Sequence, residues 1–118
     1  MALSAEGLPD KSLLIVDDDA PFRQRLARAM EARGFIVSTA ETVDEAVAIS
    51  RKAPPAFAVV DLRLGQSGNG LDLVQVLHQA RPDARVIMLT GYGNIATAVA
   101  AVKHGAIDYL SKPADADD

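Results

Sequence analysis

The chain has 118 residues, of which 49% are hydrophobic, so it is long and apolar enough for one domain with one core. The absence of cysteine excludes disulfides, a thiol nucleophile and a zinc–thiolate site. A net charge of −4 and an aromatic content of 4% give neither a basic stripe nor stacking platforms, so we expect no direct nucleic-acid binding. No long apolar run and no secretory signal are visible, which favours a cytoplasmic location without membrane contact.

The first third of the chain predicts a lead-in, a strand, a helix and a second strand. Residues 1–11 are polar and are expected to be disordered, and the folded domain is expected to cover residues 12–118. The apolar run Leu13–Val16 is typical of a strand buried on both faces. Asp19 can cap a helix over Pro21–Arg33, whose apolar face should carry Phe22, Leu26, Ala29 and Met30. A glycine follows that helix, and residues 35–40 predict the next strand.

The middle of the chain repeats this alternation. Thr42, with Glu45 three residues later, forms a capping box for a helix that ends before Pro54. Phe57–Val60 is a third apolar run that leads directly into Asp61. A glycine-rich loop follows, and then a helix marked by its apolar residues Leu71, Val74 and Leu77.

The last third predicts two more strands and one more helix. Val86–Leu89 is an apolar run that leads to Thr90, and residues 95–104 show helical spacing of apolar residues. Residues 107–110 predict a short fifth strand, followed by Lys112 and an acidic tail. Five strands alternating with helices indicate an α/β fold with an open, doubly wound parallel sheet.

Polar residues follow four of these strands: Asp17, Asp18, Asp61, Thr90 and Lys112. In a doubly wound sheet such residues converge at one edge. Three carboxylates placed together repel one another, and a hard cation such as Mg²⁺, bound by few carboxylates and several waters, relieves that repulsion. A lysine and a hydroxyl beside the cation suit the oxygens of a phosphoryl group.

Each of these residues also has a simpler structural explanation. An acid after a strand is more often a turn or helix cap, and Asp19 is expected to be one. Thr90 alone suits a strand end, Lys112 alone a solvated surface, and Tyr109 alone a half-buried strand. Four other polar residues are expected to be solvated on helices or loops: Asp72, His78, Asp83 and His104.

The chain resembles a receiver domain of bacterial two-component response regulators over about Lys11 to Pro113, in the stretches LLIVDDDAPFRQRL, AVVDLRL, GNGLDL, VIMLTGYG and AIDYLSKP. The resemblance implies a flavodoxin-like (CheY-like) strand order of 2-1-3-4-5. It makes Asp61 the phosphoacceptor, Lys112 and Thr90 its catalytic partners, and Thr90 and Tyr109 the switch pair. It implies a Mg²⁺ site formed by Asp18, Asp61 and the backbone carbonyl of Arg63, with Asp17 acting through a metal-bound water.

The same resemblance implies phosphorelay signalling rather than enzymatic turnover. A sensor histidine kinase would donate the phosphoryl group, and the helix 4/strand 5 surface would then change to control a DNA-binding output domain outside this segment and so transcription. The stretches VVDLRL and TGYGNIATAVAAVKHGAIDYLSKPADADD look most similar to redox-responsive regulators of the RegA type in alphaproteobacteria.

Two departures from the family pattern affect the expected fold. Leu64-Gly65 replaces the Met-Pro pair that many receivers have after the phosphoacceptor. Five residues follow Pro113, so a fifth helix is expected to be missing or truncated. Without that helix, parts of Leu13, Ile15 and the strand around Ile107 are expected to be exposed, and the chain can pair as a homodimer through that surface.

Three other functions fit parts of the pattern. A flavin or nucleotide binder of the same fold class would need a phosphate-cradling loop where this chain has Asp17-Asp18-Asp19. An aspartyl phosphatase would place a second acid at position 63, which is arginine. A degenerate receiver would serve only for docking, but all five site residues are present. Mg²⁺-dependent labelling by acetyl phosphate separates these alternatives.

Overall fold

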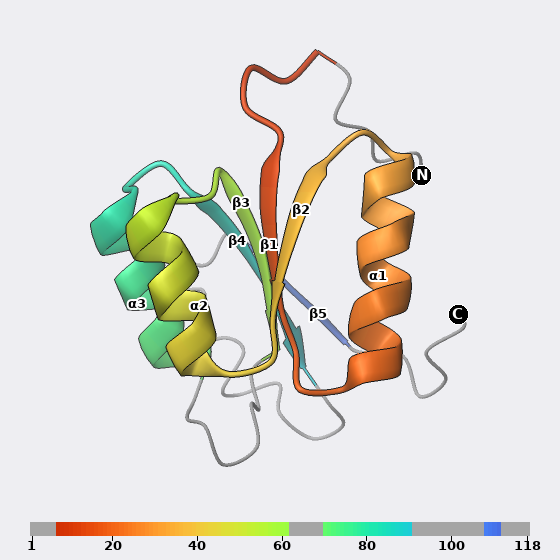
Figure 1. The fold of residues 1–118 in the computed structure, drawn as a ribbon. Helices are drawn as coiled ribbons and strands as arrows, with labels where there is room; N and C mark the ends of the chain where they lie inside the picture. Colours follow the sequence, from red (N-terminus) through yellow and green to blue (C-terminus); the bar gives the residue numbers. More distant parts are fainter. Residues whose placement is uncertain (1–6, 62–69, 91–107, 112–118) are drawn as a thin grey trace.

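The computed structural model describes residues 7–61, 70–90 and 108–111, and in them a parallel sheet lies between two layers of helix (Figure 1). Its strands are β1 (Ser12–Val16), β2 (Ile36–Ala40), β3 (Phe57–Asp61), β4 (Arg85–Thr90) and β5 (Asp108–Ser111). The described helices are α1 (Ala20–Ala32), α2 (Val43–Lys52) and α3 (Gly70–Ala80). The strand order is β2-β1-β3-β4-β5, so the predicted fold class and order are confirmed.

The helix predicted at 95–104 and the residues 112–118, where a fifth helix would begin, lie outside the described residues. Within the described ranges, no helix has both the length and the hydropathy that a membrane crossing requires.

The two faces of the sheet pack into two separate hydrophobic clusters. Alternate strand residues point to opposite faces, so Leu14 and Val16 join a cluster with α2 and α3, while Leu13 and Ile15 join a cluster with α1. Figure 1 shows the same division, with α1 on one side of the sheet and α2 and α3 on the other. Because both faces are covered, β1 and β3 carry unbroken apolar runs, Leu13–Val16 and Phe57–Val60, as predicted for buried parallel strands.

Local capping signals set the ends of α1. The Asp19 side chain accepts a hydrogen bond from the Phe22 amide at 3.2 Å, so the expected N-cap is confirmed. After the helix, Gly34 has φ 95° and its amide donates to Glu31 O, while the Phe35 amide donates to Met30 O. These two bonds form a Schellman motif, which needs the left-handed conformation that glycine adopts readily.

The apolar face of α1 is rotated slightly from the expected one. Phe22 and Met30 are buried, and Leu26 and Ala27 are partly buried against the same cluster. Ala29 is exposed, so its expected place on the buried face is wrong. Ala29 lies about 20° to one side of Phe22 on a helical projection, whereas the buried residues extend to the other side.

The expected exposure of Leu13 and Ile15 is also wrong. Their exposed fractions are 3% and 0%, because α1 and the loop that follows it cover this part of β1. Phe35, expected to start the second strand, instead precedes β2 and packs edge-on against Phe57, with ring centroids 5.6 Å apart. Ile107, which was expected to be exposed together with Leu13 and Ile15, lies outside the described residues.

The segment before β1 makes defined contacts from Leu8 onward, although it was expected to be disordered as far as residue 11. Leu8 packs against the α1-side cluster, and the Lys11 carbonyl accepts a hydrogen bond from the Ile36 amide. The Asp10 carboxylate accepts bonds from the Ser12 amide at 2.9 Å and from the Arg81 guanidinium at 2.7 Å. We call the Asp10–Ser12–Arg81 contact the clasp. It joins the lead-in to the turn between α3 and β4.

His78 is not solvated as expected. Its Nε2 lies 2.8 Å from the Ala84 carbonyl oxygen, and the ring is partly buried. The turn after α3 folds back, with the Ala84 amide donating to Arg81 O, and this brings the Ala84 carbonyl to the end of the helix. Asp72 and Asp83 are exposed, as expected, and His104 lies outside the described residues.

Candidate functional site

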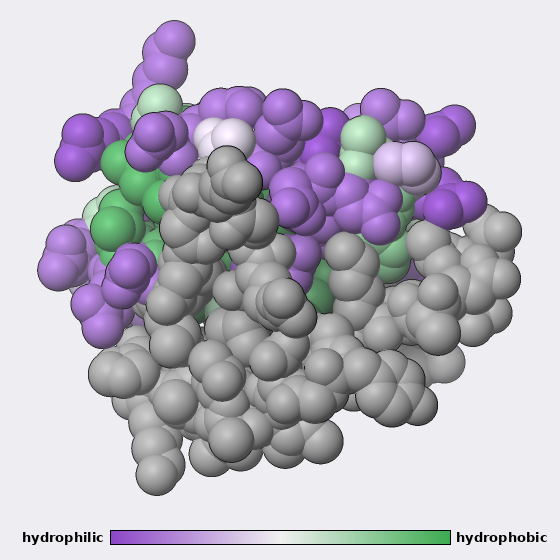
Figure 2. All heavy atoms as spheres, turned by 90° about the horizontal axis from the view of Figure 1, so that it is seen from below, coloured by the Kyte–Doolittle hydropathy of each residue, from purple (hydrophilic) through white to green (hydrophobic). Residues whose placement is uncertain are grey.

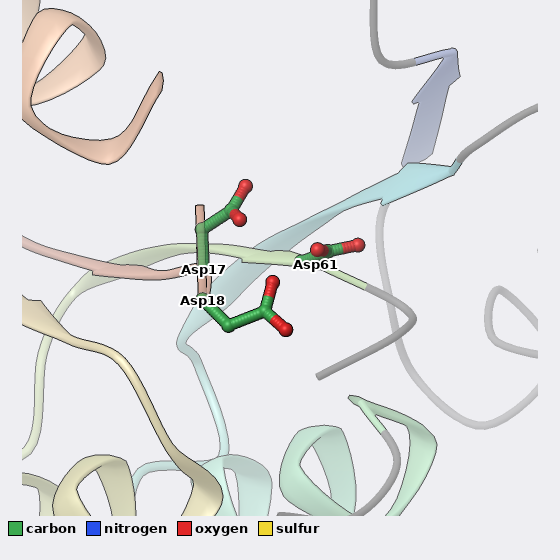
Figure 3. A group of neighbouring side chains, drawn as sticks. All are labelled: Asp17, Asp18 and Asp61. Atoms are coloured by element: carbon green, nitrogen blue, oxygen red, sulfur yellow. The ribbon is translucent and has the colours of Figure 1, made fainter. Parts of the chain in front are cut away.

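The carboxyl ends of β1 and β3 bring three aspartates together. Asp17 and Asp18 directly follow β1, and Asp61 is the last residue of β3. The two strands are neighbours, and Val16 pairs with Val60, so the acids that follow lie side by side. Figure 3 shows the three side chains gathered at this edge, and one carboxylate oxygen from each lies within 4.8 Å of the others. The convergence predicted for these three residues is confirmed.

The three acids differ in their access to water. Asp17 is fully buried and Asp61 is 6% exposed, whereas Asp18 is exposed. Two buried carboxylates beside a third are costly unless positive charge or hydrogen-bond donors compensate them. The exposed Asp18 leaves the cluster open to solvent, so an ion that binds here can keep some of its waters.

Backbone contacts hold Asp17 firmly. Its amide donates to the Ala40 carbonyl at 3.1 Å, and its Oδ1 accepts a bond from the Asp19 amide at 2.9 Å. Its carbonyl oxygen accepts a bond from Nη1 of Arg23 at 2.8 Å. Asp17 thus takes part in the turn between β1 and α1, as the simpler explanation holds, and also lies within the acidic cluster.

The donor set fits a hard divalent cation. Carboxylate oxygens are the ligands that Mg²⁺ and Ca²⁺ prefer, and Mg²⁺ binds few protein carboxylates together with waters. Oxygens that share one Mg²⁺ are at most about 4.2 Å apart. The carboxylate oxygens, which lie within 4.8 Å of one another, therefore need only a small side-chain adjustment to bind one ion together. A bound cation would also compensate the buried charge of Asp17 and Asp61.

The remaining expected site residues are placed in part or not at all. Thr90 ends β4 and pairs with Ser111, and Tyr109 on β5 pairs with Met88, so β4 lies next to β3 and β5 lies next to β4, in the expected order. The side chains of Thr90 and Tyr109 lie outside the described parts. Arg63 and Lys112 lie outside the described residues altogether.

Arg23 is a residue near the site that the sequence does not single out. It lies in the first part of α1, six residues after Asp17, and its side chain is 13% exposed. A basic residue in an early helical turn is usually a solvated charge, so the sequence carries no signal that this one turns back to the end of β1. Only the tertiary arrangement brings it there.

Figure 2 looks onto the lower end of the molecule in Figure 1 and shows hydrophilic side chains over much of the described surface. A hollow of about 260 Å³ lies at the opposite end of the sheet, lined in part by Asp10, Phe57, Arg81 and Arg85. Because the clasp already pairs the charges of Asp10 and Arg81, that hollow offers no comparable cluster of like charges.

Comparison with known proteins agrees with this geometry. The family described as the response regulator receiver domain matches residues 13–118. The chain belongs to the response regulator receiver domain family. Domains of this family act in general as regulators rather than as enzymes.

Two regulatory proteins are similar to this receiver domain over most of its length. RegA, the photosynthetic apparatus regulatory protein of Cereibacter sphaeroides, is 66% identical over 109 residues, which are 92% of this chain and 59% of RegA. ActR, the acid tolerance regulatory protein of Sinorhizobium medicae, is 66% identical over 110 residues, which are 93% of this chain and 56% of ActR. This receiver domain thus spans less than two thirds of either relative. The resemblance to RegA-type regulators is confirmed.

Solved structures share the receiver fold. A response regulator protein from Burkholderia pseudomallei, crystallised with a phosphorylated aspartic acid, a calcium ion and citrate, is 46% identical, with a TM-score of 0.83 over 92% of this chain and 63% of that one. The receiver domain of NtrX from Brucella abortus is 35% identical, with a TM-score of 0.81 over 89% of this chain and 88% of that one.

Proposed function

We propose that this receiver domain accepts a phosphoryl group on Asp61 from a sensor histidine kinase and that Mg²⁺ is needed for the transfer. The observation that carries the proposal is the position of Asp61. Its carboxylate is almost buried at the end of β3, with oxygens of Asp17 and Asp18 within 4.8 Å. A carboxylate held among other carboxylates reacts with an anionic phosphoryl donor only when cationic groups offset the repulsion.

The transfer needs one bond to form and one to break. An Asp61 oxygen attacks the phosphorus in line, the bond from phosphorus to the donor's imidazole nitrogen breaks, and the released imidazole keeps the bonding electrons and takes up a proton. Asp18, Asp61 and the Arg63 carbonyl would hold Mg²⁺, with Asp17 acting through a metal-bound water, and the bound ion would offset negative charge on the phosphoryl oxygens. We assign Lys112 and Thr90 to contacts with those oxygens.

The relatives support both parts of this proposal. The Burkholderia pseudomallei protein contains a phosphorylated aspartic acid and a divalent cation, although that cation is calcium. A Ca²⁺ ion uses the same kind of oxygen ligand as Mg²⁺ but accepts longer distances and more ligands. We assign Mg²⁺ to this chain because three carboxylates with an open side leave room for waters.

We infer that phosphorylation acts on an output outside this segment. A phosphoryl dianion on Asp61 draws the Thr90 hydroxyl toward it, and Tyr109 fills the space that becomes free. The surface formed by the predicted helix 95–104 and β5 (helix 4/strand 5) then changes between two states. RegA and ActR are regulatory proteins that are longer than this chain. We therefore propose a cytoplasmic role in transcription regulation through a DNA-binding output domain.

The acceptor assignment is tested by labelling with acetyl phosphate in Mg²⁺. Asp61→Asn should abolish hydroxylamine-sensitive phosphorylation, measured by intact-protein mass spectrometry. Asp44→Asn, an exposed acid on α2, is the matched control and should be labelled like the wild type. Full labelling of folded Asp61→Asn would exclude Asp61 as the acceptor.

A further inference from the structure

Arg23 connects α1 to the end of β1 through the backbone. Nη1 of Arg23 donates to the Asp17 carbonyl oxygen at 2.8 Å, and the Arg23 side chain as a whole is only 13% exposed. Nη2 lies 3.7 Å from Oε2 of Glu41, which is 57% exposed. The contact with Asp17 is short and partly buried, whereas the one with Glu41 is long and exposed to solvent. The hydrogen bond to Asp17 is therefore the stronger of the two and fixes the position of the guanidinium.

The carbonyl that Arg23 holds belongs to the peptide unit between Asp17 and Asp18. On the other side of Asp17, its amide is fixed by the Ala40 carbonyl at 3.1 Å. Both peptide units that flank Asp17 are therefore oriented by hydrogen bonds. A peptide is planar, so the direction of the Asp17 carbonyl also sets the direction of the Asp18 amide and the starting point of the Asp18 side chain.

We propose that Arg23 is a positioning residue that holds the Asp17–Asp18 peptide so that the exposed Asp18 carboxylate faces Asp17 and Asp61. The inference rests on the proposed Mg²⁺ site, because its consequence is a preorganised third carboxylate for that ion. Asp18 needs such support more than its neighbours do. It is exposed, whereas Asp17 and Asp61 are held by burial.

The sign of the effect separates positioning from simple electrostatics. A positive charge near a cation site repels the cation, so removal of the Arg23 charge should strengthen Mg²⁺ binding if charge alone mattered. Loss of positioning has the opposite result, because Asp18 must then be ordered when the ion binds. Partners that orient metal ligands are typically worth 10–100-fold in affinity, and for one backbone contact we expect roughly tenfold weaker binding.

The test compares Arg23→Gln with Arg28→Gln, which removes the same charge from the same helix. Arg28 is exposed and its Nε donates only weakly to the Gln24 carbonyl, at 3.4 Å. Mg²⁺ affinity is measured by calorimetry, and folding by circular dichroism in EDTA. Arg23→Gln should bind roughly tenfold more weakly, and Arg28→Gln should bind as tightly as the wild type or slightly more tightly. Unchanged or tighter binding by folded Arg23→Gln would overturn the inference.

Two further readouts exclude a general loss of structure. In the metal-free protein, the amide NMR shifts of Asp18 and Asp19 should change in Arg23→Gln and not in Arg28→Gln. Acetyl phosphate labelling of Arg23→Gln should return to the wild-type rate at saturating Mg²⁺, because Arg23 holds the backbone and does not contact the phosphoryl group. A labelling rate that stays low at saturating Mg²⁺ would contradict positioning.

Arg23→Lys keeps the charge and can donate one hydrogen bond, so it tests the inference even if Arg23→Gln fails to fold. We expect Arg23→Lys to bind Mg²⁺ a few-fold more weakly than the wild type and more tightly than Arg23→Gln. Wild-type Mg²⁺ affinity in Arg23→Lys despite changed amide shifts of Asp18 would count against the assignment. A wild-type protein that binds no Mg²⁺ would instead refute the proposed metal site.

Discussion

Three consecutive aspartates after β1 have three different environments. Asp17 is buried with its backbone held on both sides, Asp18 is exposed beside the cluster, and Asp19 caps α1. The differences arise because a strand ends, a turn reverses the chain and a helix begins within three residues. One residue type thus contributes a buried carboxylate, an exposed carboxylate and a helix cap.

Removal of the Asp18 carboxylate should weaken Mg²⁺ binding without unfolding the protein. Asp18→Ala takes one charged ligand from the proposed site, while the exposed position of Asp18 limits the cost to stability to within about 0.5 kcal/mol. Calorimetric titration should show at least roughly tenfold weaker binding. Asp44→Ala on α2 is the control for an exposed acid. Equal Mg²⁺ affinity in Asp18→Ala and the wild type would remove Asp18 from the site.

At the residue scale, the sequence predicted which acidic residues lie together, but it did not predict individual hydrogen bonds from side chains to the backbone. The convergence of Asp17, Asp18 and Asp61 follows from strand ends that share one edge of the sheet. The contact of His78 with the Ala84 carbonyl and that of Arg23 with the Asp17 carbonyl depend on how separate elements pack. Neither histidine nor arginine has a pattern in the sequence that specifies a backbone partner across a turn.

At the scale of elements, helix ends were predictable because their signals are local. Asp19 and Gly34 delimit α1 through hydrogen bonds within a few residues of each end. Thr42 caps α2 in the same way, since its Oγ1 accepts a bond from the Glu45 amide at 3.1 Å. The rotation of the buried face of α1, which leaves Ala29 exposed, was not predictable because the neighbouring loop and strands set it.

The cap of α2 gives a direct measure of this local contribution. Thr42→Ala removes the acceptor for the Glu45 amide and should lower the free energy of unfolding by about 0.5–2 kcal/mol. Thr42→Ser keeps the hydroxyl and should remain close to the wild type. Urea unfolding followed by circular dichroism measures both. Equal stability of Thr42→Ala and Thr42→Ser would show that this bond contributes little.

At the scale of the whole molecule, β1 contributes residues to the hydrophobic clusters on both faces of the sheet, so both of its faces are covered. The expected exposure of Leu13 and Ile15 was wrong because it assumed that α1 covers only part of that face. In the structure, Phe35 and Leu8 extend the cover beyond the helix itself. Residues outside regular elements therefore complete this face, and the periodicity of helices and strands carries no information about them.

The clasp should make stability depend on pH in the acid range. The pKa of Asp10 is lowered from 3.8 to about 2, first by the hydrogen bond from the Ser12 backbone amide and then by the bond with the Arg81 side chain. The folded state thus favours the carboxylate. Its contribution is complete above the unfolded pKa of 3.8 and is lost as the pH falls through about 2.

Asp10→Asn isolates this contribution. It should be less stable than the wild type near neutral pH, and the difference should shrink as the pH falls from about 4 to about 2. Urea midpoints across this range measure the difference. Asp83→Asn is the matched control, because Asp83 also contacts Arg81 at 3.2 Å but its side chain is 79% exposed. A difference between Asp10→Asn and the wild type that does not vary with pH would contradict the assignment.

The clasp and the acidic cluster lie at opposite ends of β1, whose five residues span roughly 17 Å. Arg85, at the clasp end of β4, is exposed, and the chain contains no cysteine. A cysteine placed at Arg85 would therefore be the single thiol available to a fluorescent dye or a surface linker. An attached probe there would leave the end with the acidic cluster free, so that ion binding and encounters with the proposed kinase could be followed on immobilised single molecules.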